Sequence, residues 1–317
     1  MRKLGSPPSV SVVINTLLGR PYTERCIDAL LTQEDAPPLE IIVPVCLPFD
    51  NVEHLREAYP DVRLPVISKL PPGADPSHPS FAHLIYDRRR AVGLAVATAD
   101  IIALTEDQVV PDPHWCASIA EAHAAAPYGA IGGAVENGGT GVLHRALYLC
   151  DFGRYQRPFR ARETAYLTDQ NVSYKRAAIE KVRHIWSEMY HETAVHEALR
   201  NAGEKLWLTP QCVVCLRRGE LRLFQQLRER CAWGRVFGGT RARRVSARHR
   251  AALLLLSPAI PLLIVFRLLK GNSSTEVLLA LPVISLMAFS WTLGEAVGYA
   301  TARPFPNSRG FKFTEST

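Results

Sequence analysis

The first two hundred residues of the chain alternate between short runs of β-branched and other apolar residues and longer stretches with helical spacing. The runs that predict strands lie at residues 10–14, 39–43, 62–67, 100–104 and 130–135. The stretches that predict helices lie between them, at residues 21–33, 54–59, 88–98 and 113–126. Continuous apolar strands that alternate with helices are typical of a mostly parallel sheet covered by helices on both faces. The sequence therefore predicts an α/β domain whose ligands bind beyond the carboxyl ends of the strands.

Composition excludes several classes of protein. Hydrophobic residues make up 47% of the 317 residues and charged residues 21%, which excludes a disordered or collagen-like chain and a transporter with many spans. The seven cysteines are scattered among apolar neighbours, which indicates reduced thiols rather than a disulfide scaffold. Cys212 and Cys215 form a C-x-x-C pair, but no second pair or histidine cluster completes a zinc site. Core packing is the preferred interpretation of this pair.

Positive charge is concentrated in residues 217–250, which hold eleven arginines, no lysine and two acids. The excess of nine positive charges in this stretch exceeds the net charge of the whole chain, which is +7. Anionic phospholipid is the expected partner, because polybasic segments next to a membrane are attracted to its headgroups. Nucleic acid is not expected as a partner, because few aromatic side chains accompany the arginines.

Two apolar segments follow the arginine-rich stretch. Residues 251–266 contain no charged side chain, and residues 277–300 contain one, Glu295. As helices the two segments would be ~24 Å and ~36 Å long, against a hydrocarbon core of ~30 Å. They predict a transmembrane hairpin over residues 251–302, and the alternative is two buried helices of a soluble domain. By the positive-inside rule, the flanking basic residues then place the rest of the chain in the cytoplasm, at the inner (plasma) membrane.

Acidic side chains come directly after the strand that is predicted to end at Leu104. Glu106 and Asp107 are adjacent, and two such acids do not both ionise cheaply unless a positive group lies beside them. A divalent cation bound to a diphosphate meets that need, because oxygen ligands suit Mg²⁺ or Mn²⁺. The alternative is that the two acids cap the helix that begins near Pro113. Asp112 is better placed than either of them to cap that helix.

With these acids in place, the chain resembles the family 2 glycosyltransferases, which are inverting nucleotide-sugar enzymes with the GT-A fold. The resemblance covers residues 9–240, and it is the order of the motifs that makes it specific. The matching segments are residues 11–16, 25–33 and 39–43, Arg90-Ala-Val-Gly93, Glu106-Asp107-Gln108, residues 168–176 and 191–203, and Trp233-Gly-Arg235. The resemblance implies a GT-A-like, Rossmann-related sheet.

The resemblance also implies roles for individual residues. Glu192 takes the position of the catalytic base, which accepts the proton of the attacking hydroxyl. The implied donor-binding residues are Thr16, Arg90, Glu106 and Asp107; the implied metal ligands for Mg²⁺ or Mn²⁺ are Asp107 and Gln108; the implied acceptor-binding residues are Asn171 and Trp186. The implied substrates are a nucleotide-sugar donor and a lipid-linked or polysaccharide acceptor.

The chain departs from the family pattern at several positions. Pro44 and the residues after it replace the acid that usually follows the second strand, and Gln108 replaces the third acid of the Asp-rich motif. These departures leave open a catalytically weak homologue that binds a nucleotide-sugar or a partner without turnover. Nucleotidyl transfer on the related fold would need a glycine-rich basic loop after the first strand, which residues 17–20 do not provide.

Four segments are therefore predicted. They are a catalytic domain over residues 1–216, an arginine-rich interfacial segment over 217–250, the transmembrane hairpin over 251–302 and a cytoplasmic tail over 303–317.

Overall fold

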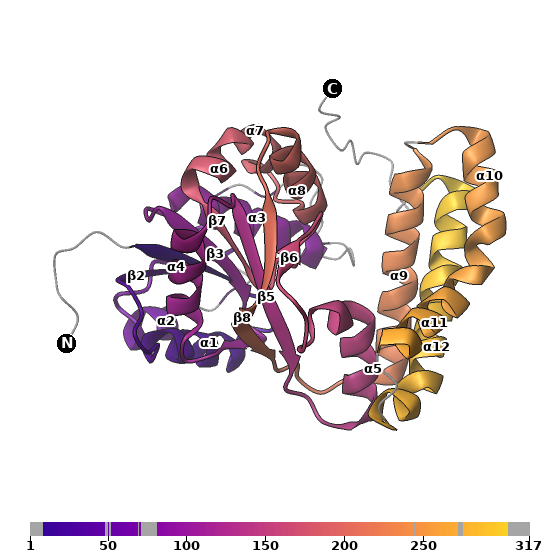
Figure 1. Cartoon of the computed structure of the whole chain (residues 1–317), viewed down its shortest axis with the longest axis horizontal. Helices are drawn as coiled ribbons and strands as arrows, with labels where there is room; N and C mark the ends of the chain where they lie inside the picture. The colour runs from indigo at the N-terminus through magenta and orange to yellow at the C-terminus, as the bar shows by residue number, and fades with distance from the viewer. Residues whose placement is uncertain are drawn as a thin grey trace. The chain divides into compact units, whose positions relative to one another are not determined.

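The computed structural model describes residues 9–47, 50, 52–68, 70, 81–243, 245–271 and 275–303, which form two compact units (Figure 1). Unit 1 extends to Gly138 and resumes over Tyr155–Arg217. Unit 2 contains Gly139–Arg154 and the described residues from Arg218 onward. A helix within Gly139–Arg154 thus clusters with the C-terminal part of the chain, although the sequence predicted a single catalytic domain over residues 1–216.

Unit 1 is built around one mixed sheet, which has eight strands in the described residues. They are β1 (Val10–Asn15), β2 (Leu39–Ile42), β3 (Ile101–Glu106), β4 (Val109–Pro111), β5 (Ala130–Asn137), β6 (Arg162–Glu163), β7 (Val172–Lys175) and β8 (Leu206–Leu216). Their order is β2-β1-β3-β7-β5-β8-β4, and β6 pairs with β8. Strands β2, β1, β3, β5 and β8 point in one direction, whereas β7, β4 and β6 run against their neighbours. The predicted α/β class with a mostly parallel sheet is confirmed.

Helices enclose this sheet, as Figure 1 shows. They are α1 (Tyr22–Leu31), α2 (Glu53–Ala58), α3 (Phe81–Val96), α4 (Trp115–Ala125), α6 (Arg176–Lys181), α7 (Arg183–Trp186) and α8 (Glu192–Asn201), with the short η1 (Gly153–Tyr155) at the junction of the units. Every residue of β1 is buried, which requires cover on both faces of the sheet. Helix α3 lies so close to β1 that a Cβ atom at Gly93 would be 2.2 Å from Cγ1 of Val13. Glycine at this position therefore permits the contact.

Some local expectations differ from the structure. The strand predicted over residues 62–67 consists of two isolated bridges, from Arg63 to Ile42 and from Val66 to Val45. Helix α3 begins at Phe81 rather than at residue 88. The loop predicted over residues 71–79 lies outside the described residues. Strand β7 lies between β3 and β5 and is antiparallel to both, an arrangement that the sequence did not predict.

A buried histidine makes the stability of unit 1 sensitive to acid. The Nε2 atom of His123 on α4 lies 2.9 Å from Oγ of Ser173 on β7, and burial followed by the charge of Lys175 lowers the pKa of His123 from 6.5 to about 4. The unfolded chain therefore binds a proton that the folded chain excludes, so stability falls as pH decreases from 6.5 to 4. We expect the wild-type protein to lose about 3 kcal/mol more than His123→Asn over this range, measured by urea denaturation. Equal losses would contradict a neutral, buried His123.

Unit 2 consists of helices (Figure 1). They are α5 (Gly141–Phe152), α9 (Leu223–Ala242), α10 (Ala247–Leu256), η2 (Ser257–Ala259), α11 (Ile260–Gly271) and α12 (Thr275–Thr301). In the described residues one helix is long and apolar enough to cross a membrane, over Val277–Thr301, with a mean hydropathy of 1.9. The other apolar run, residues 251–266, is divided between α10 and α11 by the 3-10 turn that contains Pro258. The structure thus supports one candidate span rather than clearly two. The predicted tail lies outside the described residues apart from Arg303.

Two arginines of the predicted interfacial segment share one carboxylate within unit 2. Asp151 at the end of α5 forms ion pairs with Arg230 of α9 and with Arg218, the latter at 2.7 Å. Other arginines of the same segment are exposed, namely Arg217, Arg222, Arg228, Arg241, Arg243 and Arg248. The basic character of this surface is therefore carried by a subset of the eleven arginines.

Candidate active site

The candidate site lies where β1 and β3 end side by side. The two strands are parallel, and Asn15 at the end of β1 is in register with Glu106 at the end of β3. The backbone N–H of Asp107 donates to the carbonyl oxygen of Asn15 at 3.1 Å. The acids that the sequence singled out therefore stand at the carboxyl edge of the sheet, next to the residues that follow β1.

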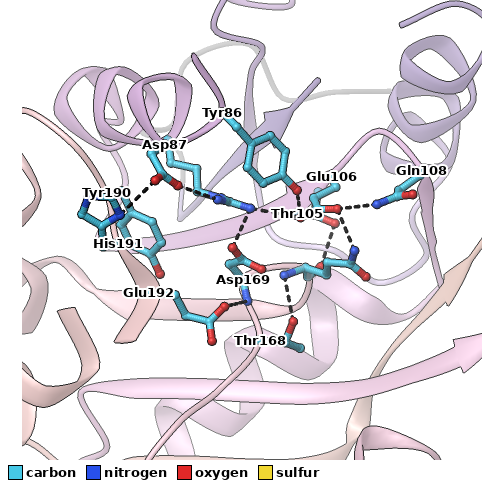
Figure 2. A network of polar contacts seen from close by, with 12 residues as sticks. Tyr86, Asp87, Thr105, Glu106, Gln108, Thr168, Asp169, Tyr190, His191 and Glu192 are labelled. Atoms are coloured by element: carbon cyan, nitrogen blue, oxygen red, sulfur yellow. Dashed lines mark hydrogen bonds and ion pairs between the residues drawn. The ribbon is translucent and has the colours of Figure 1, made fainter. Parts of the chain in front are cut away.

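Arg90 of α3 is the centre of a buried polar network, and its partners Asp87, Glu106 and Asp169 are labelled in Figure 2. Its guanidinium forms ion pairs with Glu106 at 3.0 Å, with Asp169 at 2.6 Å and with Asp87 at 3.3 Å. The Arg90 side chain is 2% exposed, and its guanidinium carbon lies 3.9 Å from the centre of the Tyr86 ring. A buried cation is stable only when acids and hydrogen bonds surround it, and the two terminal nitrogens of Arg90 meet that requirement, whereas its Nε has no hydrogen-bond partner among the described residues.

Glu106 accepts hydrogen bonds from three uncharged side chains in addition to the Arg90 contact. The donors are the Tyr86 hydroxyl, Nε2 of Gln108 at 2.7 Å and Nε2 of Gln170 at 2.7 Å. Burial raises the pKa of Glu106 well above its ordinary value of 4.5, and the nearby charge of Asp169 raises it further. The network therefore holds more carboxyl groups than cationic partners, which favours a proton or another positive group at this edge.

Asp107 is held by the loop that follows β1. Its Oδ2 accepts the backbone N–H groups of Leu17, Leu18 and Gly19 at 3.0, 2.8 and 2.7 Å. Its other oxygen, Oδ1, is buried and has no hydrogen-bond partner among the described residues. Burial raises the pKa of Asp107 although the three amides act in the opposite direction.

Other unpartnered polar atoms lie on the same segment as this loop. Both side-chain polar atoms of Asn15 and the hydroxyl of Thr16 are buried without a hydrogen-bond partner in the described part of the chain. Buried polar atoms in native proteins are nearly always satisfied, so such a group indicates a place where a ligand or water completes the bonding. The carboxylates of Glu106 and Asp107 accept from other groups than the start of α4, whereas Oδ1 of Asp112 accepts the N–H of His114 just before that helix, at 3.1 Å.

The donor set at this edge is compatible with one Mg²⁺ or Mn²⁺ ion of the type that is bound partly by substrate. Oδ1 of Asp107 is a buried carboxylate oxygen without a partner, and such ions commonly use one or two carboxylates together with phosphate oxygens. Gln108 directs its Nε2 to Glu106. No cluster of three histidine, cysteine or acidic side chains suited to a metal occurs among the described residues.

Glu192 is the first residue of α8 and is partly buried. Its Oε2 accepts the backbone N–H of Asp169 at 3.3 Å (Figure 2). Loss of solvent raises the pKa of Glu192 well above 4.5, and the carboxylate of Asp169 adds to this effect, while Arg90 opposes it. A carboxylate with a raised pKa accepts a proton more readily than an ordinary one, which suits a general base.

The two residues expected to bind the acceptor have structural contacts. Asn171 accepts the indole N–H of Trp115 at 2.9 Å and donates to the carbonyl oxygens of Ala134 and Cys212. Trp186 is fully buried and donates its indole N–H to the carbonyl oxygen of Ile179 at 2.8 Å. Neither side chain presents a free polar group or an exposed ring. These contacts do not favour direct binding of the acceptor by Asn171 or Trp186.

Several residues of the network were not singled out by the sequence. Asp169 and Asp87 contact Arg90, and Nδ1 of His191 lies 2.9 Å from Oδ2 of Asp87. Asp169 lies in the segment 168–176 that resembles the acceptor-side motif, but the resemblance assigns no role to its acidic side chain. Asp50 is a further case: it accepts the N–H of Cys46 and pairs with Arg89, which places a carboxylate near the end of β2.

The chain matches no protein-family model and no curated protein. Among solved structures it is similar to S. aureus TarS 1-349, with 13% sequence identity and a TM-score of 0.47 over 66% of this chain. It is also similar to S. aureus TarS 1-349 in complex with UDP-GlcNAc, with 14% identity and a TM-score of 0.47 over 68% of this chain. The match spans 60% of the length of each TarS chain.

Proposed function

We propose that the chain is an inverting glycosyltransferase that moves a sugar from a nucleotide-sugar donor to a lipid-linked or polysaccharide acceptor. The observation that carries the proposal is one connected edge of the sheet. Unpartnered buried atoms of Asn15, Thr16 and Asp107 stand at one end of it, and Glu192 with its raised pKa stands at the other. Arg90 joins the two ends through Glu106 and Asp169. The ordered motifs over residues 9–240 support the same assignment.

In this proposal each residue has a separate role in one nucleophilic displacement at the anomeric carbon of the donor sugar. The acceptor hydroxyl attacks the anomeric carbon from the face opposite the diphosphate, and Glu192 accepts the hydroxyl proton. The bond from the anomeric carbon to the diphosphate oxygen breaks, and the nucleoside diphosphate leaves with the electron pair. Asn15, Thr16 and Asp107 bind the donor, while Arg90 keeps Glu106 and Asp169 in position. A Mg²⁺ or Mn²⁺ ion held by Asp107 and Gln108 would offset the charge on the leaving diphosphate.

A panel of nucleotide-sugars tests the proposed function directly. We expect one donor to raise the thermal unfolding midpoint of the full chain, because a ligand at one hundred times its dissociation constant stabilises by ~2.7 kcal/mol. The same donor should release nucleoside diphosphate when membrane extract supplies the acceptor. Stabilisation without release from any donor would identify the catalytically weak alternative. Absence of stabilisation across the panel would contradict the proposal.

We expect Asp107→Asn to weaken nucleotide diphosphate binding about tenfold in Mn²⁺, which is ~1.4 kcal/mol. The asparagine oxygen keeps an acceptor for the three amides of the loop after β1, so the change removes mainly the negative charge. Calorimetric titration with and without chelator measures both affinities, and Asp112→Asn is the matched control. Equal affinities of wild type and Asp107→Asn in Mn²⁺ would show that Asp107 only organises the loop.

We also propose that the reaction takes place at the cytoplasmic face of the inner membrane. The apolar helix α12 and the exposed arginines around α9 and α10 support this location. Anionic headgroups attract arginines at the surface, and apolar side chains partition into the bilayer independently of salt.

A further inference from the structure

Helix α12 presents one continuous apolar stripe to the outside of unit 2. Its exposed members recur at helical spacing over most of the helix and are Leu278, Leu279, Leu286, Phe289, Leu293 and Val297. Phe289 is 61% exposed and Leu279 is 64% exposed. No charged or hydrogen-bonding side chain interrupts these positions. A stripe of this length on the outside of a helix requires an apolar environment.

The opposite side of α12 contains three buried residues with polar groups. Thr292, Glu295 and Tyr299 are buried, and the two oxygens of Glu295 accept the Trp291 indole N–H at 3.1 Å and the Tyr299 hydroxyl at 2.7 Å. A surface helix of a soluble protein shows the reverse distribution, with apolar residues inside and polar residues outside. The outward apolar stripe of α12 is therefore organised for contact with lipid.

The alternative of two buried helices in a soluble core is also inconsistent with α10 and α11. Their exposed large apolar side chains are Leu255, Leu256, Leu262, Leu263 and Phe266. Single exposed leucines are common on soluble proteins, but these side chains and the stripe on α12 together expose many large apolar groups on one unit.

The pairing of α9 with α12 argues against a crossing of the bilayer. The hydroxyl of Ser290 donates to the carbonyl oxygen of Leu227 at 2.7 Å, and a Cβ atom at Gly294 would lie 1.9 Å from the carbonyl oxygen of Cys231. Ser290 is at the middle of the apolar window of α12, so the start of α9 lies beside that middle. The exposed charges of Arg228 and Glu229 directly follow Leu227.

The part of α12 that α9 leaves free is too short to span a bilayer. Residues 277–289 would measure only ~20 Å along the helix axis, against ~30 Å for the hydrocarbon core. A full crossing would therefore place Arg228 and Glu229 in hydrocarbon, which is strongly unfavourable for exposed charges.

We infer that unit 2 lies along the surface of an anionic bilayer, with the outward stripe of α12 facing the acyl chains of one leaflet. The exposed arginines at the two ends of α9 and at the start of α10 complement anionic headgroups. In this arrangement no charged residue of α9 enters the hydrocarbon. The predicted transmembrane hairpin is replaced by an in-plane bundle, and both ends of α12 remain on the cytoplasmic side.

Cysteine accessibility distinguishes an in-plane bundle from a crossing. Thr275 at the start of α12 and Gln225 on α9 are both exposed, and each is changed to cysteine in the full chain expressed in bacterial cells. A membrane-impermeant maleimide is added to spheroplasts or to inverted vesicles, and peptide mass spectrometry measures the label at position 275 or 225. We expect both positions to react in inverted vesicles and neither in spheroplasts. Reaction of Thr275→Cys in spheroplasts would establish a crossing, and no reaction on either side would place this end of α12 in the bilayer; both results overturn the inference.

A second measurement identifies what covers the stripe. Phe289→Asp should reduce flotation of the purified chain with phosphatidylcholine–phosphatidylglycerol vesicles at least about tenfold, the effect of removing one large apolar side chain from the lipid. The matched change Phe224→Asp alters an exposed aromatic on the mixed polar face of α9 and should have a much smaller effect. Unchanged flotation of Phe289→Asp would overturn the inference, and a dimer that becomes a monomer would then assign the stripe to a second copy of the chain. Neither measurement depends on transfer activity.

Discussion

Replacement of Glu192 by glutamine is expected to reduce sugar transfer by ~10²–10⁴-fold while leaving nucleotide affinity nearly unchanged, because a general base contributes this much to the rate. Glutamine keeps the size of the side chain and still accepts the N–H of Asp169, so only the proton acceptor is lost. Turnover of the donor identified by the panel measures the rate, and calorimetry measures the affinity. Retention of more than about a tenth of the rate would show that another group accepts the proton.

The pH dependence of the wild-type enzyme provides an independent check of the same residue. Glu192 must be ionised to accept a proton, and its pKa lies well above 4.5, so the rate should fall as pH decreases through this raised value. The exposed Glu188 is the control, because Glu188→Gln alters a neighbouring carboxylate outside the network and should leave rate and pH profile unchanged. A rate that is constant down to pH 4.5 would argue against Glu192 as the base.

Replacement of Arg90 by methionine is expected to destabilise the protein by about 3–5 kcal/mol, because removal of one partner leaves buried charges uncompensated. Three carboxyl groups, those of Asp87, Glu106 and Asp169, lose their shared cation. The native state should then bind protons more tightly than the unfolded chain, so the loss of stability grows as pH increases above the ordinary carboxyl pKa. Urea denaturation at pH 5 and pH 8, with proteolysis of unit 1 as the readout, measures the effect.

The control for Arg90 is an arginine at the surface of the same unit. Arg183 pairs with Glu180 one helical turn away and is half exposed, so Arg183→Met should change stability by no more than ~0.5 kcal/mol. A similar loss for both variants would indicate that the packing of the long side chain, rather than the charge of Arg90, stabilises the network. A loss for Arg90→Met that does not depend on pH would contradict the assigned electrostatic role.

Much of unit 1 could be predicted from local patterns. Runs of buried β-branched residues predicted β1, β2, β3 and β5 close to their observed positions, and helical spacing predicted α1, α2 and α4. These predictions succeed because a strand covered on both faces is apolar at most positions, which is visible in the sequence without knowledge of its neighbours. The strand expected at residues 62–67 did not form a ladder, because it meets β2 only at two isolated bridges.

The sequence by itself determined that acids stand at the end of β3, since Glu106 and Asp107 directly follow an apolar run and the carboxyl ends of parallel strands share an edge. It did not determine which distant groups surround them. The pairing of Arg90 with Asp169 and the amides that hold Asp107 each join segments far apart in the chain. Local periodicity shows which face of a helix or strand is buried. It does not show which other element covers that face, because this depends on the order of the strands in the sheet. Strand β7, for example, lies between β3 and β5 and is antiparallel to β3. The same reason applies to α12. Its length and composition predict contact with a membrane. How deeply it can enter the hydrocarbon depends on the charged residues of α9 that lie beside it, and only the tertiary structure shows that pairing.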